Sequence, residues 1–115
     1  MSPWTRVKRP IIVRIGEIRE LGGWEHADWP GYFFDRRKSP AVWCITEENT
    51  GRLVAGRFRT REEALKAMPE LEKRVRLTIQ TSKMYDRMIE QFRELLHLHE
   101  IEEEKRDEPQ ERASS

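Results

Sequence analysis

Arginines in two neighbouring segments are the side chains of this chain best suited to binding a ligand. Four lie within residues 52–61, and two more stand beside a lysine at 36–38. A guanidinium group donates hydrogen bonds in a fixed plane that suits phosphates and base edges, and a small β-sheet can present such groups to DNA or RNA. We therefore expect nucleic-acid binding through seven basic residues: Arg36, Arg37, Lys38, Arg52, Arg57, Arg59 and Arg61.

Three other groups could carry catalysis or hold a metal ion. Glu94 and His97 have the Glu-x-x-His spacing of di-iron carboxylate bundles, but such a site needs a second copy, which the sequence lacks. Cys44 falls in the middle of an expected strand, where a buried structural role is favoured over a nucleophilic one. His26, flanked by acidic residues and tryptophans, leaves open a small enzyme with an acid and a base in one pocket. We favour a protein with no catalytic residue, no metal and no cofactor.

Composition limits the classes of protein to which the chain can belong. It has 115 residues, enough for one modest core, and 37% of them are charged, against about 25% in average chains. The formal net charge of +1 gives no overall attraction to nucleic acid, so any such attraction must be local. No apolar run approaches the roughly 20 residues of a membrane helix, a secretory signal is not expected, and the one cysteine excludes an internal disulfide. We expect a cytoplasmic protein of prokaryotic or phage type that does not enter a membrane.

Charge and residue type divide the chain near its middle. Residues 1–60 hold eleven basic and seven acidic side chains, whereas residues 61–115 hold eleven basic and fourteen acidic ones. All six glycines and all four tryptophans belong to the first part. This division predicts a β-rich domain over 1–68, a helical extension over 69–106 and a disordered tail over 107–115. The acidic second half also leaves open a nucleic-acid mimic that blocks a DNA-binding partner.

Apolar alternation and turn residues predict the first strands of the β-rich domain. A strand of β-branched residues is expected at 10–16, and a short aromatic strand at 32–34. Between them, residues 21–31 read as a long connection rich in turn residues. We expect Trp24 and Trp29 of this connection to cover the sheet.

The clearest local pattern is a β-hairpin over 41–59, with its turn at residues 49–51. Strict alternation along this hairpin places Trp43 and Phe58 on one face and Arg57 and Arg59 on the other. Base stacking would need aromatic rings interleaved with the arginines. The sequence therefore predicts no exposed stacking platform beside these arginines.

A capping box marks the start of the helical part of the chain. The hydroxyl of Thr60 can accept the N–H of residue 63, while the carboxylate of Glu63 can reach back to the N–H of Thr60. We expect a helix at 60–68 that ends at Pro69, since proline cannot donate the helical hydrogen bond, and a new helix that begins there. Residues 75–79 alternate as a strand would, but the spacing favours a helix there as well.

The last expected helix, from about 83 to 105, carries an apolar stripe spaced like the seam of a coiled coil or bundle. At 1.5 Å per residue it is roughly 33 Å long, more than so small a core can cover. We expect the sheet to cover its first turn and to leave Phe92, Leu95 and Leu96 for a partner. The stripe predicts a homodimer, or a larger protein partner, bound through six residues: Tyr85, Met88, Ile89, Phe92, Leu95 and Leu96.

Together these elements predict an α+β fold: a small antiparallel sheet of three or four strands with a packed helix and a long C-terminal helix. Residues 49–64, which read NTGRLVAGRFRTREEA, resemble the last hairpin and helix start of the arm-type DNA-binding domains of phage integrases. The resemblance implies a sheet that enters the major groove, but it transfers no base-contacting residue, and no integrase catalytic portion follows. We interpret the chain as a small non-catalytic binding protein that binds DNA or RNA through the basic hairpin. The alternative is a protein-interaction module that uses the long helix.

Overall fold

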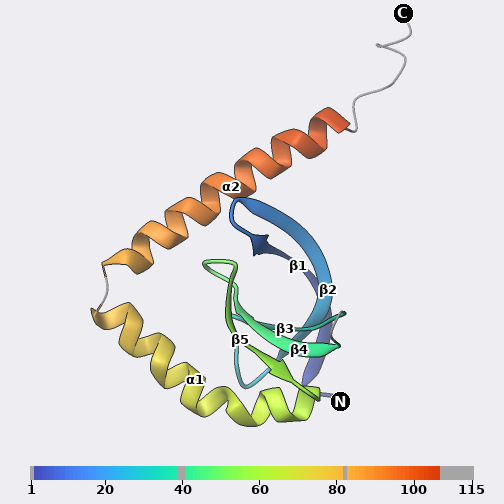
Figure 1. Ribbon diagram of the computed structural model, residues 1–115, viewed down its shortest axis with the longest axis vertical. Coiled ribbons are helices and arrows are strands. Elements are labelled where there is room, and N and C mark those ends of the chain that lie inside the picture. The colour runs from blue at the N-terminus through green and yellow to red at the C-terminus, as the bar shows by residue number, and fades with distance from the viewer. Residues whose placement is uncertain (1, 39–40, 82, 107–115) are drawn as a thin grey trace, which may run out of the picture.

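The computed structural model describes residues 2–38, 41–81 and 83–106. Over these residues five strands come first: β1 (Trp4–Arg14), β2 (Glu17–His26), β3 (Tyr32–Arg37), β4 (Val42–Glu47) and β5 (Arg52–Phe58). Two helices follow, α1 (Arg61–Thr81) and α2 (Met84–Arg106). The strands form one antiparallel sheet in chain order (Figure 1). The α+β class is confirmed, but the sheet has five strands rather than the expected three or four.

The first two strands form a long hairpin where the sequence predicts one short strand and a loop. β1 pairs with β2 along its length, so much of the expected connection at 21–31 is strand. The turn between them contains Gly16, whose φ of 75° suits glycine. Gly23 lies inside β2 because a Cβ there would come within 2.5 Å of the ring of Phe33 and of the backbone oxygen of Phe34. Glycine at this position serves close strand packing and not a turn.

The buried residues lie on both faces of the sheet, mainly around β3 and β4. The buried cluster on one side joins the sheet to α1 through six residues: Tyr32, Phe34, Ile45, Ala64, Met68 and Leu71. On the other side the sheet curls on itself and buries Ile11, Phe33 and Thr46. The N–H of Ile12 donates to the carbonyl of Gly51 at 2.8 Å, so β1 closes against the turn between β4 and β5. Figure 1 shows β1 and β2 arching around the shorter strands.

The start of α1 follows the expected capping box only in part. Thr60 Oγ1 accepts the N–H of Glu63 at 3.0 Å, as predicted. The Glu63 carboxylate accepts the N–H of Arg59 at 3.1 Å, one residue earlier than predicted. The two bonds fix the angle at which the chain leaves β5 and enters α1.

α1 is one helix and not the two that Pro69 predicts. It runs through Pro69 to Thr81, so residues 75–79 are helical and the alternative strand is not formed. Met68 and Leu71, on either side of the proline, are buried in the core. Their packing outweighs the single hydrogen bond that proline cannot donate.

The apolar stripe of α2 is used largely within the chain. Phe92 is only 4% exposed and packs on Gly51, where a Cβ would lie 2.3 Å from its ring. The hydroxyl of Tyr85 donates to the Glu47 carboxylate at 3.0 Å. Phe92 is therefore covered by its own chain, and the prediction that it is left for a partner is wrong. The rest of the stripe is partly buried: Met88, Ile89, Leu95 and Leu96.

The expected tail at 107–115 lies outside the described residues. Within the part of the chain that the structure describes, neither helix has the length and apolar character needed to cross a membrane.

Candidate nucleic-acid interface

Three of the seven expected basic residues line one recess at the end of the sheet. Arg36 belongs to β3, Arg59 follows β5 and Arg61 opens α1. With Trp24 and Trp43 they surround a recess of about 410 Å³. The remaining lining residues are Thr60 and Glu62. We call this site the tryptophan–arginine recess; it has net positive charge and two aromatic walls.

A β-bulge interrupts β5 close to the recess. Between two successive paired positions β4 advances by two residues and β5 by three, so β5 contains one extra residue. Arg57 lies in this extra stretch and has a φ of 70°. Beyond the bulge Trp43 pairs with Phe58, where β5 ends. Strand alternation therefore does not extend to Arg59, which lines the same recess as Trp43 although strict alternation predicts opposite faces.

Tryptophan rings hold two arginines in place near the recess. The guanidinium carbon of Arg61 lies 4.3 Å from the ring centre of Trp4 and 4.9 Å from that of Trp24. Arg6 of β1 lies 5.3 Å from the ring centre of Trp24. A stacked guanidinium keeps the N–H groups at its edge available and has less rotamer freedom to lose on binding. The rings therefore hold the guanidinium groups of Arg6 and Arg61 in position to bind an oxyanion.

One carboxylate stands beside the recess arginines. Glu62 Oε1 lies 3.9 Å from Arg61 Nε, and the Glu62 side chain is 69% exposed. An ion pair this long and this exposed contributes little, whereas a phosphate can accept two parallel hydrogen bonds from one arginine. A phosphate can therefore replace Glu62 as the partner of Arg61.

The other four expected basic residues do not line the recess. Arg37 Nε donates at 3.1 Å to Asp35, which is 1% exposed. Burial raises the pKa of Asp35, and Arg37 opposes that rise. Arg52 donates to Gln91 of α2 at 3.2 Å, so it links the hairpin to the last helix. Two more are exposed outside the recess: Lys38 and Arg57.

The sequence predictions miss Arg6 and the role of both recess tryptophans. Trp24 is expected in a loop and Trp43 on the opposite face of the hairpin. Residues 4–8 show no strict alternation, because the apolar Trp4 and Val7 stand three positions apart. The available signal for Arg6 is the β-forming type of its neighbours Thr5 and Val7, which would extend the first predicted strand towards the N-terminus.

Two of the groups considered for catalysis, His26 and Cys44, are buried. His26 is 6% exposed, stands edge-on to Trp4 with ring centres 4.7 Å apart, and accepts the N–H of Asp28 on Nδ1 at 3.1 Å. Burial raises the pKa of the Cys44 thiol, which disfavours the nucleophilic thiolate. Among the described residues, no three His, Cys, Asp or Glu side chains gather as a metal ion would require. Two of the considered residues are exposed on α2: Glu94 and His97.

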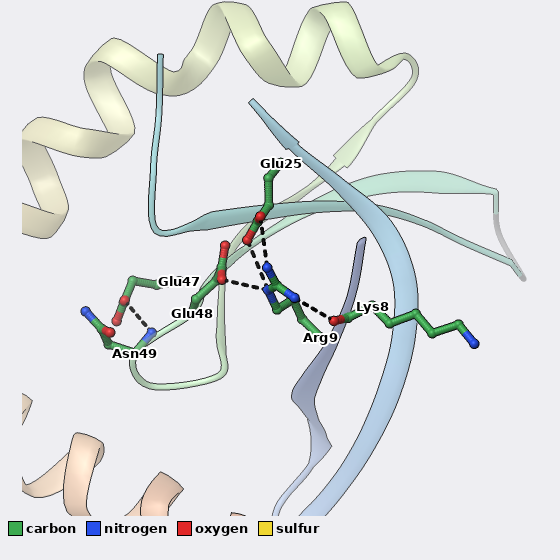
Figure 2. A network of polar contacts seen from close by, with 6 residues as sticks. All are labelled: Lys8, Arg9, Glu25, Glu47, Glu48 and Asn49. Carbon is green, nitrogen blue, oxygen red and sulfur yellow. Dashed lines mark hydrogen bonds and ion pairs between the residues drawn. The ribbon is translucent and has the colours of Figure 1, made fainter. Parts of the chain in front are cut away.

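A separate polar network joins β1, β2 and the turn after β4 (Figure 2). Arg9 donates to both carboxylate oxygens of Glu25, at 3.1 and 3.0 Å, and its Nε also donates to Glu48 at 3.2 Å. Burial, followed by the hydrogen bond and charge of Glu25, raises the pKa of Glu48 to about 7. The hydrogen bond with Glu48, together with Arg9, holds the pKa of Glu25 below its usual range. We call this network the carboxylate clasp, because it ties the hairpin turn to the first two strands.

The chemistry of the tryptophan–arginine recess suits an oxyanion. Arg36, Arg59 and Arg61 line one recess, and the tryptophan rings stacked on Arg61 restrict its movement. The carboxylate clasp instead pairs its only arginine with two acids of the same chain. Comparison of the chain with protein-family models, with curated proteins and with solved structures finds no match.

Proposed function

We propose that this protein binds nucleic acid at the tryptophan–arginine recess, with its arginines on backbone phosphates. The observation that supports this proposal is that Arg36 of β3, Arg59 just after β5 and Arg61 at the start of α1 all line one recess. Phosphates along a strand are closely spaced anions, so arginines on different elements can bind neighbouring ones. Such binding is non-catalytic and depends little on base sequence, because phosphate contacts carry no sequence information.

The surfaces left free by the fold suggest how the nucleic acid approaches. α1 covers one face of β4 and β5, and the curl of the sheet buries Phe33 and Thr46 on the other. Insertion of a sheet face into a groove, as the integrase resemblance implies, would need one of these faces. We therefore expect the nucleic acid to cross the end of the sheet. There the exposed Lys38 and Arg57, each two residues from a recess arginine, extend the basic surface.

The test is the salt dependence of binding to a labelled oligonucleotide, as single strand and as duplex, in DNA and RNA. The Arg36→Gln, Arg59→Gln double variant should bind more weakly at low salt. Its slope of log affinity against log salt should be smaller by about two, because each lost phosphate contact removes roughly one unit. Fluorescence anisotropy at several salt concentrations measures both quantities.

A matched control removes the same charge from elsewhere. Arg87 and Arg93 are exposed on α2, so the Arg87→Gln, Arg93→Gln double variant should keep the salt slope of the unmodified chain. Equal losses in the two double variants would mean that net charge, and not the recess, attracts the oligonucleotide. Absence of binding to all four oligonucleotides at low salt would end the proposal.

A second candidate function is protein association through α2. Leu98 is 56% exposed, and Leu95, one turn earlier on the helix, is only partly buried. An apolar pair of this kind on a long helix suits a homodimer or a larger protein partner. Sedimentation of the unmodified chain should show a dimer, and Leu95→Asp with Leu98→Asp should give a folded monomer. A monomer at high micromolar concentration would exclude self-association.

A further inference from the structure

Figure 1 shows α1 and α2 diverging from the short link between them. A second cavity is lined by residues of the β4–β5 hairpin and of both helices. α1 ends at Thr81 and α2 begins at Met84, and both helices contribute side chains to the cavity. Its volume is about 280 Å³, and it shares no lining residue with the tryptophan–arginine recess. We call it the helix-apex cavity.

The walls of the helix-apex cavity are mainly apolar. They come from β5, α1 and α2, and the apolar members are Leu53, Val54, Leu71, Val75 and Met88. Leu53 is 51% exposed, so part of this apolar wall faces solvent in the unliganded chain. Removing such a wall from water favours binding of an aliphatic group.

The cavity also contains an unpaired donor. Arg52 lines it, and the Nε of Arg52 is buried with no hydrogen-bond partner among the described residues. The outer nitrogen of the same guanidinium donates to Gln91 at 3.2 Å, which holds the group in place. Because this Nε is closed off from solvent, an anion in the cavity would meet the guanidinium at its outer N–H groups, one nitrogen of which already donates to Gln91. Arg74 gives the lining a second positive charge.

The single acid of the lining is already engaged within the chain. One oxygen of Glu47 accepts the hydroxyl of Tyr85 at 3.0 Å, and the other accepts the N–H of Asn49 at 2.8 Å (Figure 2). Glu47 therefore has its hydrogen bonds met, whereas Arg52 does not. The open polar group of the cavity is a cation, and it calls for an anionic acceptor.

We propose that the helix-apex cavity binds a small amphipathic carboxylate. Its aliphatic chain lies against the apolar walls, and its carboxylate accepts hydrogen bonds from the outer N–H groups of the Arg52 guanidinium. The volume of about 280 Å³ is just below the roughly 300–1,000 Å³ of pockets for drug-sized ligands. The fitting ligand is therefore a medium-length chain with one acidic head. This site is independent of the nucleic-acid proposal.

The test uses three probes with the same aliphatic chain: octanoate, octanol and octylammonium. Calorimetric titration of the full chain should show octanoate binding at least tenfold more tightly than either of the others. Arg52→Gln should weaken octanoate at least tenfold and leave octanol unchanged. Val75→Phe, which fills the cavity, should abolish octanoate binding. Leu77→Phe, on the same helix but 60% exposed and outside the lining, should preserve it.

Each contrary outcome overturns the assignment. Equal affinity for octanol and octanoate would show a merely apolar cavity, and a preference for octylammonium would make Glu47 the recognition group. Equal loss in Val75→Phe and Leu77→Phe would put the binding elsewhere. If the chain binds no probe and forms a dimer that Val75→Phe dissociates, the occupant of the cavity is a second copy of the chain. Circular dichroism of each variant checks that the fold is retained, and Arg52→Gln decides the matter if Val75→Phe unfolds.

Discussion

Because of the carboxylate clasp, the free energy of unfolding should decrease as the pH rises from mildly acidic to mildly basic. The pKa of Glu48 rises from its ordinary 4.5 to about 7 in the folded chain, first because of burial and then because of Glu25. The folded protein therefore holds a proton that the unfolded chain releases. This contribution to the free energy of unfolding is fully present below pH 4.5 and is lost as the pH rises through about 7.

The size of the effect follows from the same two pKa values. At 1.36 kcal/mol per pKa unit, the gap between 4.5 and about 7 sets an upper limit of about 3.4 kcal/mol. The side chains of Arg9, Glu25 and Glu48 are 39%, 26% and 20% exposed, so solvent screens part of the interaction. We expect about 1–2 kcal/mol after that screening. The lowered pKa of Glu25 acts in the opposite direction, but only below about pH 4.5.

The decisive variant is Glu48→Gln, because its amide mimics the protonated acid at every pH. Urea unfolding followed by tryptophan fluorescence should find it about 1–2 kcal/mol more stable than the unmodified chain at pH 8, and nearly equal to it at about pH 4. Glu20→Gln, at an exposed position of β2, is the matched control and should leave the pH dependence unchanged. Parallel stability curves for Glu48→Gln and the unmodified chain would refute the reasoning.

Two further predictions concern the contact between α2 and the hairpin turn. Phe92→Ala should cost about 3–4 kcal/mol in the same urea assay, because a ring that is 4% exposed leaves a cavity, whereas Leu98→Ala should cost less than about 0.5 kcal/mol. Gly51→Ala should destabilise by about 1–3 kcal/mol, because φ is 64° and the new Cβ would lie 2.3 Å from the Phe92 ring. Near-neutral values for both Phe92→Ala and Gly51→Ala would show that α2 is not held at this turn.

Local chemistry predicts the hairpin and the helix start well. The turn at 49–51 and the alternation on either side of it give β4 and β5, and Thr60 with Glu63 marks the start of α1. These features depend on residues that are close in the sequence. They are therefore visible without knowledge of the rest of the fold.

The features that the sequence does not predict depend on contacts that form only in the folded chain. Gly23 reads as a turn residue until Phe33 of the next strand is seen packing against it. Pro69 reads as a helix end until the burial of its neighbours in the core is known. The recess includes Arg59, which follows the end of β5, so the alternation that predicts opposite faces for Trp43 and Arg59 no longer applies there. In each case tertiary packing overrides a local preference.

The chain-order arrangement of the strands also bears on the kinetics of folding. Each strand pairs with its neighbour in sequence, so most of the sheet can form through short loop closures, which favours rapid folding. Two of the contacts that span long stretches of chain meet at Gly51, the hydrogen bond from Ile12 and the packing of Phe92. β1 and α2 thus converge on one turn, and these contacts should form last. Variants at that turn should therefore speed unfolding and leave the folding rate almost unchanged.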